Sequence, residues 1–316
     1  MLNANWLGEL RLEKGGLRVK KTDALVRFDW GNLQAASRGL LSHILVQGLR
    51  LFNVLAPGRS YAIAFTPMIP APWYLIWSTI HAGKGRITKN IAKADALYFF
   101  DDSTVSNHQF LQIDGPARPR LHINTNCTDI SKAKVQRVFE QVFGYALAID
   151  PSQFTGLAVE KSDENGAHDG RVVQCPCPRQ PGKVYERLIV NTDNGNTVLD
   201  YRSPTVGGQV PLVYIKERPI KQRFANFNSK VRLVTPASIY SPQELQLLRQ
   251  FTQQMGLDFG GLDVLRNRED GRIYVVDVNK TDMGPPTSLG FVDQLKSVRI
   301  MAKAFREFVI LGRKDA

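Results

Sequence analysis

The chain has 316 residues, enough for roughly two domains of about 150 residues each, which excludes a peptide or a small disulfide scaffold. Hydrophobic residues make up 43% and charged residues 22%, values near the globular average that exclude wholesale disorder, collagen and coiled coil. Lysine and arginine number 41 against 29 aspartates and glutamates, so the net charge of +12 at pH 7 predicts attraction to polyanions such as nucleotides, nucleic acid or acidic metabolites.

The cysteines and the most apolar stretches bear on the cellular compartment. Cys127, Cys175 and Cys177 are too few for a secreted disulfide framework, so a cytoplasmic location is expected. The Cys-Pro-Cys pair lacks a second pair of ligands and does not favour a zinc site. The N-terminus shows no secretory pattern, and residues 40–55 and 62–80 are interrupted by polar residues and prolines. We therefore predict no membrane span and no membrane partner.

Short strands and helices in the first 125 residues predict a small α/β unit. Apolar residues at three- and four-residue spacing over 33–55 predict an amphipathic helix that packs on a core. A basic helix on a membrane surface is not favoured, because Arg38 and Arg50 are too few cations. A second helix is predicted to start near Trp73. Buried strands are predicted at 61–65, 96–100 and 121–123.

From residue 128 onward, helices with clear capping signals are interspersed with short strands. Thr128 or Asp129 can cap a helix that stops at Gly144 in the left-handed conformation. A capping box at 241–244 opens a helix that Gly256 closes. A final helix is predicted over 291–308, and strands are predicted at 157–161, 172–174, 185–190, 212–216, 262–265 and 273–278.

Three oxygen-bearing side chains come together in the predicted hairpin near residues 262–279. Side chains alternate along a strand, so Asp277 and Asn279 share a face, and hairpin pairing can bring Asp263 beside them. Two carboxylates and an amide oxygen suit a hard divalent cation, and magnesium that keeps other positions for water and nucleotide phosphates fits best. From the spacing alone, a polar hairpin face turned to solvent is an equally good account.

The same stretch resembles the metal-binding end of an ATP-grasp enzyme. Asp263 is followed fourteen residues later by Asp277, then by Asn279 and a loop with glycine and proline. That family ends its nucleotide domain with an acidic strand residue, a hairpin, an E-x-N strand and a small-residue loop. This chain departs from the pattern with Asp277 in place of the usual glutamate, and with Gly261 where the family often has arginine. The resemblance implies that Asp263, Asp277 and Asn279 hold magnesium.

Upstream features occur in the order that the ATP-grasp family has. Lys132, in the helix that starts near residue 129, would reach a phosphate. Lys161 and the glycine-bearing turn at 162–170 look like the lysine strand and the lid over the triphosphate, since lysine supplies a charge and glycine lets backbone N–H groups approach phosphate. Without the resemblance to the ATP-grasp family, the same segment would be interpreted as an ordinary hairpin. His168 in this turn has no helpful spacing to other histidines.

The resemblance also implies an adenine site and an arginine for the reaction intermediate. Residues 213–217 stand where the family has its interdomain linker, whose backbone pairs with adenine and whose acidic residue holds ribose. Arg232 lies on a segment that resembles the strand directing a basic residue at the phosphates or the acyl phosphate, so Arg232 and Lys161 are the catalytic candidates. The nucleotide-binding candidates are Lys132, Lys161, Tyr214, Ile215, Lys216, Glu217 and Arg232.

The fold implied by the resemblance is α/β (α+β), with an ATP-grasp nucleotide domain over residues 126–316 preceded by a small Rossmann-like α/β domain over residues 1–125. The implied activity is an ATP-dependent, C–N bond-forming ligase with ATP and Mg²⁺ as cofactors. It would phosphorylate a carboxylate to an acyl phosphate that an amine or another nucleophile captures. The implied partners are small-molecule carboxylate and amine substrates, nucleic acid is not favoured, and homo-oligomerisation stays open.

Other functions remain open on the sequence. The same fold can serve a kinase that phosphorylates a small molecule without ligation, or a degenerate scaffold that binds nucleotide without reacting. A basic nucleic-acid-binding protein is the alternative from another class, and it predicts steep salt dependence of binding. In the ligase interpretation, much of the positive surplus neutralises a triphosphate. The cations expected to do so are Lys132, Lys161, Lys216, Arg232 and Lys280.

Overall fold

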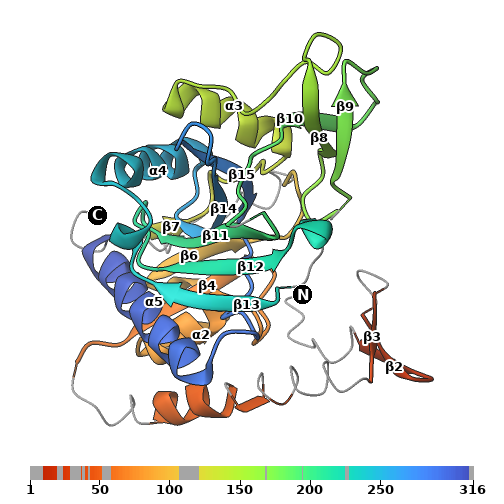
Figure 1. The fold of residues 1–316 in the computed structure, drawn as a ribbon. Coiled ribbons are helices and arrows are strands. Elements are labelled where there is room, and N and C mark those ends of the chain that lie inside the picture. Colours follow the sequence, from red (N-terminus) through yellow and green to blue (C-terminus); the bar gives the residue numbers. More distant parts are fainter. Residues whose placement is uncertain are drawn as a thin grey trace. The chain divides into compact units, whose positions relative to one another are not determined.

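The computed structural model describes residues 10–19, 24–28, 37, 40, 41, 43–51, 58–106, 121–167, 169–193, 195–224 and 228–312 (Figure 1). The chain forms two compact units. The first unit contains residues 1–100, 115–121 and 283–316, and the second contains residues 101–114 and 122–282. The C-terminal segment thus belongs with the N-terminal unit, whereas the sequence boundaries of 1–125 and 126–316 put it with the nucleotide domain.

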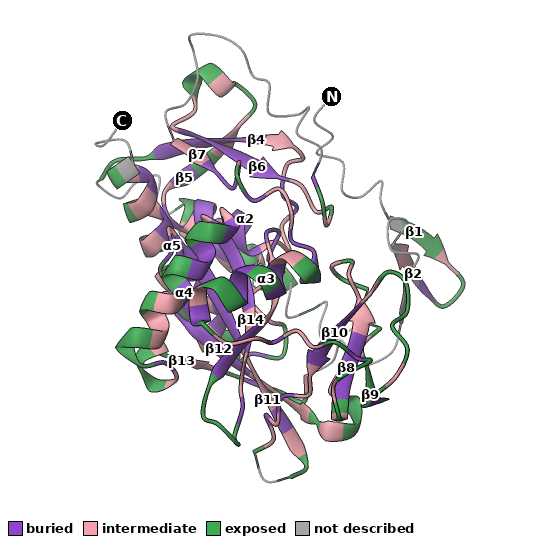
Figure 2. Ribbon diagram, turned by 90° about the horizontal axis from the view of Figure 1, so that it is seen from above, coloured by how far each residue is buried: buried purple, intermediate pink, exposed green. Residues whose placement is uncertain are grey.

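A parallel sheet forms the centre of the first unit. β4 (Tyr61–Pro67) pairs in parallel with β5 (Gly85–Thr88) on one side and with β6 (Ala96–Phe100) on the other, and β7 (Leu121–Ile123) follows β6 in the sheet order. β4 and β6 are near-continuous apolar runs, as parallel strands buried on both faces require. β4 and β6 are accordingly buried along most of their length (Figure 2).

The helices of the first unit pack against one another. α2 (Leu75–Ala82) contacts α5 (Phe291–Gly312). The described residues 40, 41 and 43–51 are also helical, and we call this segment the 40–51 helix; the rest of the helix predicted over 33–55 lies outside the described residues. A separate antiparallel sheet and a short 3₁₀ helix complete this unit: β1 (Leu10–Glu13), β2 (Gly16–Val19), β3 (Ala24–Arg27) and η2 (Ile91–Lys93).

The second unit is built on an antiparallel sheet with the order β13-β12-β11-β14-β15. Two helices, α3 (Lys132–Phe143) and α4 (Pro242–Met255), lie on one side of this sheet and share a core with it (Figure 1). Phe139 of α3 and Phe251 of α4 are fully buried there. The strands are β11 (Thr197–Val206), β12 (Val213–Pro219), β13 (Lys230–Val234), β14 (Phe259–Arg266) and β15 (Ile273–Asn279).

A smaller three-stranded sheet has β8 at its centre, with β9 and β10 antiparallel on either side. Its strands are β8 (Gly156–Ser162), β9 (Arg171–Cys175) and β10 (Lys183–Arg187), and two 3₁₀ helices, η4 (Ile220–Gln222) and η5 (Pro236–Ser238), lie later in the chain. Among the described residues no helix is long and apolar enough to cross a membrane.

The helix ends follow the capping signals, with one shift. The capping box is present: the Ser241 hydroxyl accepts from the Glu244 N–H at 3.2 Å, and the Glu244 carboxylate accepts from the Ser241 N–H at 2.8 Å. Gly144 and Gly256 end α3 and α4 with φ of 75° and 68°. Ser131, rather than Thr128 or Asp129, is the N-cap of α3, so Lys132 is the first residue of that helix.

The net charge divides unequally between the two units. The first unit carries 21 lysines and arginines against 8 aspartates and glutamates, a net +13, whereas the second carries 20 against 21, a net −1. This differs from the expectation that much of the surplus lies in the nucleotide domain. The cations of the second unit are matched by carboxylates, for example Lys161 by Glu186 and Lys216 by Asp263.

Candidate active site

A cavity of about 230 Å³ lies in the second unit. Its walls come from the start of α3, the β8–β9 hairpin, the end of β10 and the strands β11, β12, β14 and β15. Cations and carboxylates face each other across it. Of the residues predicted from the sequence, Lys132, Lys161, Lys216, Asp263 and Asp277 line the cavity.

Lys132 enters the cavity from the first turn of α3. The Ser131 hydroxyl accepts from the Lys134 N–H at 3.3 Å and so sets where the helix begins. The buried Lys132 ammonium donates to the Glu164 carbonyl oxygen in the β8–β9 hairpin at 2.6 Å. Burial lowers the pKa of Lys132 because the charged form loses hydration, although the nearby Asp277 opposes the shift.

Lys161 lies between β10 and β15. Its ammonium pairs with the Glu186 carboxylate at 2.8 Å and donates to the Val276 carbonyl oxygen at 2.9 Å. The Gln136 amide of α3 donates to the same Glu186 oxygen at 3.0 Å. Three elements therefore hold this lysine in place, on the strand before the glycine-bearing turn.

The turn between β8 and β9 also borders the cavity, through Gly166, Asp169 and Gly170. The Gly170 backbone lies close against the Phe224 ring, since a Cβ at Gly170 would lie 2.8 Å from a ring carbon. His168 lies outside the described residues.

Asp263 is compensated by two cations. It lies opposite Arg202 of β11, whose guanidinium donates to one Asp263 oxygen at 2.9 Å, while Lys216 donates to the other at 3.2 Å. Burial raises the pKa of the Asp263 carboxyl, but the two cations outweigh burial and hold the pKa well below its ordinary value. Asp263 is therefore ionised at neutral pH.

Arg202 is a site residue that the sequence analysis missed. Its guanidinium bridges Asp263 and Asp282, with the bond to Asp282 at 2.5 Å. It occupies the space beside Gly261, where a Cβ would lie 2.7 Å from Arg202 Nε and 2.5 Å from Asp282 Oδ2. The glycine two residues before Asp263 thus makes room for an arginine from the neighbouring strand. A usable signal was present in Asp200-Tyr201-Arg202, where two charged side chains share one strand face.

Asp277 lies opposite Asp263 on the neighbouring strand, and no ion pair at contact distance is found for it among the described residues. Burial raises its pKa, and Lys132 and Lys161 only partly offset burial. Its Oδ1 atom is buried and has no hydrogen-bond partner among the described residues. Within that part of the chain no three histidine, cysteine or acidic side chains are grouped to hold a metal. Asp263 and Asp277 are the two carboxylates of the cavity that the sequence analysis predicted, and Asp169, Glu186 and Asp200 also line it.

Asn279 is placed at the end of β15, opposite Gly261, and does not line the cavity. Its amide oxygen accepts from the Thr281 N–H at 3.0 Å and from the Thr281 hydroxyl at 3.3 Å. The side chain thus closes the turn that follows the strand.

The predicted adenine linker is an inner strand. Residues 213–217 belong to β12, which pairs with β11 on one side and β13 on the other. The backbone N–H and C=O groups of an inner strand form hydrogen bonds to the neighbouring strands. The backbone groups of Tyr214, Ile215 and Glu217 are therefore not available to pair with adenine. None of these three lines the cavity; Leu188 and Ile189, just after β10, do.

Arg232 binds Glu217 and does not reach this cavity. It lies on β13, where its guanidinium donates to Glu217 at 2.8 Å, and its side chain is 47% exposed. Neither Arg232 nor Arg202 is among the residues that line the cavity. The arginine that binds Asp263 is Arg202 on β11, and Arg232 on β13 binds Glu217.

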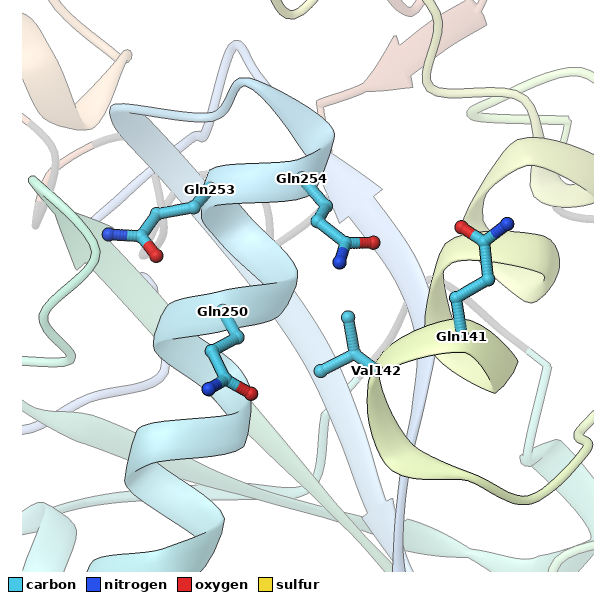
Figure 3. A pocket seen from close by; sticks show the side chains of 5 residues that line it. All are labelled: Gln141, Val142, Gln250, Gln253 and Gln254. Atoms are coloured by element: carbon cyan, nitrogen blue, oxygen red, sulfur yellow. The ribbon is translucent and has the colours of Figure 1, made fainter.

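A second, open depression of about 500 Å³ lies between α3 and α4. Figure 3 shows Gln141 and Val142 on α3 and Gln250, Gln253 and Gln254 on α4 around it. Four amides and a valine offer no titratable or nucleophilic group, so the charged cavity is the candidate active site.

The sequence matches no protein-family model and no protein of curated function. Solved structures do match the fold. The ATP-grasp ligase PsnB, complexed with a phosphomimetic variant of minimal precursor, Mg and ADP, has a TM-score of 0.51 at 12% identity and covers 81% of this chain and 99% of its own. PsnB complexed with minimal precursor, Mg and ADP has a TM-score of 0.50 at 12% identity, and the match covers 80% of this chain and 98% of that one. D-alanine–D-alanine ligase from Bacillus anthracis complexed with ATP has a TM-score of 0.49 at 12% identity, and the match covers 81% of this chain and 99% of that one.

At this level of identity the likeness concerns the fold alone. The parallel sheet, the antiparallel sheets and the flanking helices form a mixed α/β structure. The fold expected from the sequence resemblance is confirmed: the chain has the ATP-grasp fold.

Proposed function

We propose that this protein is an ATP-dependent ligase that activates a carboxylate with magnesium-ATP and passes the acyl group to an amine or another nucleophile. The observation that carries the proposal is Asp277. Its Oδ1 is buried without a hydrogen-bond partner among the described residues, opposite Asp263 and near Lys132 and Lys161. A buried carboxylate oxygen is costly unless paired, and a bound cation would pair it.

The acidic residues suit magnesium by their chemistry. Carboxylate oxygens are preferred by hard divalent cations, and Asp277 has an oxygen to give. We assign Asp263 and Asp277 as ligands; Asn279, the third ligand expected from the sequence, accepts from Thr281 and does not line the cavity. Bound there, magnesium would supply positive charge to the phosphate oxygens of the nucleotide.

The chain's own cations would act on the phosphates. Lys132 reaches the cavity from α3, Lys161 from β8 and Lys216 from β12. Fixed cations facing a site of developing charge stabilise it without reorganisation. We assign Lys161 to this catalytic role. Arg202, which binds Asp263 and Asp282 and does not line the cavity, is assigned to holding Asp263 in position and not to the phosphate contact predicted for Arg232.

The base of the nucleotide is assigned to the segment after β10. Here the chain leaves the small sheet, and Leu188 and Ile189 offer apolar contact beside the polar Asn191. We propose this segment as the adenine site in place of residues 213–217. The carboxylate and amine substrates are expected to be small molecules, and a C–N bond is the expected product.

The test is a thermal-shift and product experiment on the full chain. Magnesium-ATP should raise the melting temperature of the wild type, and a screen of pooled amino acids and small acids should reveal ATP hydrolysis coupled to a ligated product. Lys161→Ala should abolish turnover, whereas the matched cation variant Arg232→Gln should retain it. No shift with magnesium-ATP would end the proposal, and a stable phosphorylated product without an acceptor would make the protein a kinase.

A further inference from the structure

The 40–51 helix is apolar on two sides. On one side Val46 is 2% exposed and packs with Trp77 of α2 and Val298 of α5. Other positions leave large apolar side chains in solvent: Leu40 is 62% exposed, Leu41 48%, Ile44 56% and Leu51 71%. A surface helix normally presents polar residues to water, so a helix apolar beyond its packing face indicates a second contact.

Exposed apolar side chains are concentrated in the same unit. Of thirteen large hydrophobic side chains that are exposed among the described residues, ten belong to the first unit and three to the second. Single exposed hydrophobics are normal, but four on one helix, Leu40, Leu41, Ile44 and Leu51, are of the kind that marks an interaction surface. Besides the 40–51 helix they include Leu12, Phe28 and Val292.

The first unit also carries the whole positive surplus, a net +13 against −1 for the second unit. Part of it lies in a row on α5, where Lys296, Arg299 and Lys303 are exposed at the three- and four-residue spacing of one helix face. No ion pair is described for these three side chains. Unpaired cations on a strongly basic body attract an anionic partner over distances near the Debye length of about 10 Å.

We propose that the first unit binds the surface of an anionic lipid bilayer, with the 40–51 helix lying in the interface. Apolar side chains of an interfacial helix enter the boundary between headgroups and acyl chains, while basic residues hold anionic headgroups. No helix in the described part of the chain is long and apolar enough to cross a bilayer, which needs about 20 residues. The cations counted for this helix in the sequence, Arg38 and Arg50, are supplemented by those of α5 and the rest of the unit.

A lipid surface accounts for both features better than other occupants do. A second copy of this chain would cover the apolar side chains but bring together two bodies of net charge +13, which repel. Nucleic acid would neutralise the charge and leave Leu40, Ile44 and Leu51 in water. An anionic bilayer offers both negative charge and an apolar layer beneath it.

The test is flotation of the full chain with vesicles at 150 mM salt. We expect it to float with vesicles of phosphatidylcholine and 30% phosphatidylglycerol and not with phosphatidylcholine alone. The double variant Ile44→Ser, Leu51→Ser should lose binding, whereas the matched control Leu157→Ser, Val172→Ser, with exposed apolar residues of the second unit, should bind as the wild type. Replacing Lys296, Arg299 and Lys303 by Gln should weaken binding about tenfold or more.

Several results would overturn the proposal. They are absence of binding to the anionic vesicles, equal binding to neutral vesicles, and unchanged binding of the Ile44, Leu51 double variant. A dimer in light scattering that this double variant dissolves, without lipid binding, would make the helix an interface between copies. The melting temperature without ligand, measured on every variant, reports folding, so that the lipid proposal is tested independently of the magnesium-ATP shift on which the ligase proposal depends.

Discussion

Asp277 is the residue on which stability and function are expected to conflict. Its pKa is raised by burial, so its protonated form favours folding below the unfolded-state pKa of about 3.9, and that contribution is lost as pH rises through the folded-state pKa. The ionised form of Asp277 therefore destabilises the ligand-free protein, and a bound cation would stabilise it.

We accordingly expect Asp277→Asn to stabilise the ligand-free protein and to abolish its response to magnesium-ATP. Removing a buried unpaired charge should gain about 1–3 kcal/mol, and the gain should be larger at pH 7.5 than at pH 4.5. Thermal melts at both pH values, with and without magnesium-ATP, measure this. The control Asp150→Asn changes an exposed carboxylate that binds Ser152, and it should keep the nucleotide response. A nucleotide shift that persists in Asp277→Asn would contradict the metal assignment.

Gly261 is expected to contribute to stability because neighbouring side chains leave no room for a Cβ, and not because of its backbone conformation. A Cβ there would lie 2.7 Å from Arg202 Nε and 2.5 Å from Asp282 Oδ2, inside van der Waals contact. Gly261→Ala should therefore push apart the buried Arg202–Asp282 pair and cost about 1–3 kcal/mol in denaturant unfolding. Gly290→Ala is the matched control, because nothing lies within 4 Å of a Cβ at that position. Equal stability of the two variants would show that the pair adjusts freely.

At the scale of single elements, α4 shows how much a local pattern determines. The capping box of Ser241 and Glu244 was readable from four consecutive residues, and both of its hydrogen bonds are present. Glu244 also binds the Arg266 guanidinium of β14 at 2.8 and 3.0 Å, which joins the start of the helix to the sheet.

Ser241→Ala should lower the free energy of unfolding by about 1 kcal/mol, since the Glu244 N–H loses its acceptor. Ser241→Gly should cost only a few tenths of a kcal/mol, because glycine is tolerated at an N-cap. Denaturant melts of the two variants distinguish a capping effect from a general loss at this position. Equal losses would mean that the hydroxyl contributes through some other contact.

β11 is among the strands that the sequence analysis did not predict, although it is the central strand of the five-stranded sheet. Its buried positions include Arg202, Ser203 and Thr205, so it lacks the apolar alternation by which a strand is recognised. Ser203 is satisfied by the Tyr240 hydroxyl at 2.7 Å and Arg202 by two carboxylates. Partners distant in the chain make a polar strand stable in the core.

At the scale of the molecule, the unequal net charge of the two units predicts that nucleotide binding and lipid binding respond differently to salt. Magnesium-ATP is proposed to meet local, partly buried cations in a unit of net charge −1, whereas lipid meets an exposed surface of a unit of net charge +13. Salt screens exposed charges far more than buried ones.

Raising potassium chloride from 50 to 300 mM should therefore change the Kd of magnesium-ATP by less than about fivefold and weaken vesicle binding much more. Isothermal titration and flotation on the same preparation measure the two responses. A nucleotide affinity that falls as steeply as vesicle binding would place the nucleotide on the exposed basic surface and not in the cavity of the second unit.

The sequence by itself determined the helix ends at Gly144, Ser241 and Gly256, most strand positions and the pairing of Asp263 with Asp277, because each depends on a few neighbouring residues or on one hairpin. Only the tertiary structure decided which arginine lies at the carboxylates, that residues 213–217 form an inner strand, and that the surplus charge gathers with the C-terminal helix in one unit. Arg202 and Asp263 are 61 residues apart, and no local pattern encodes a contact over that separation.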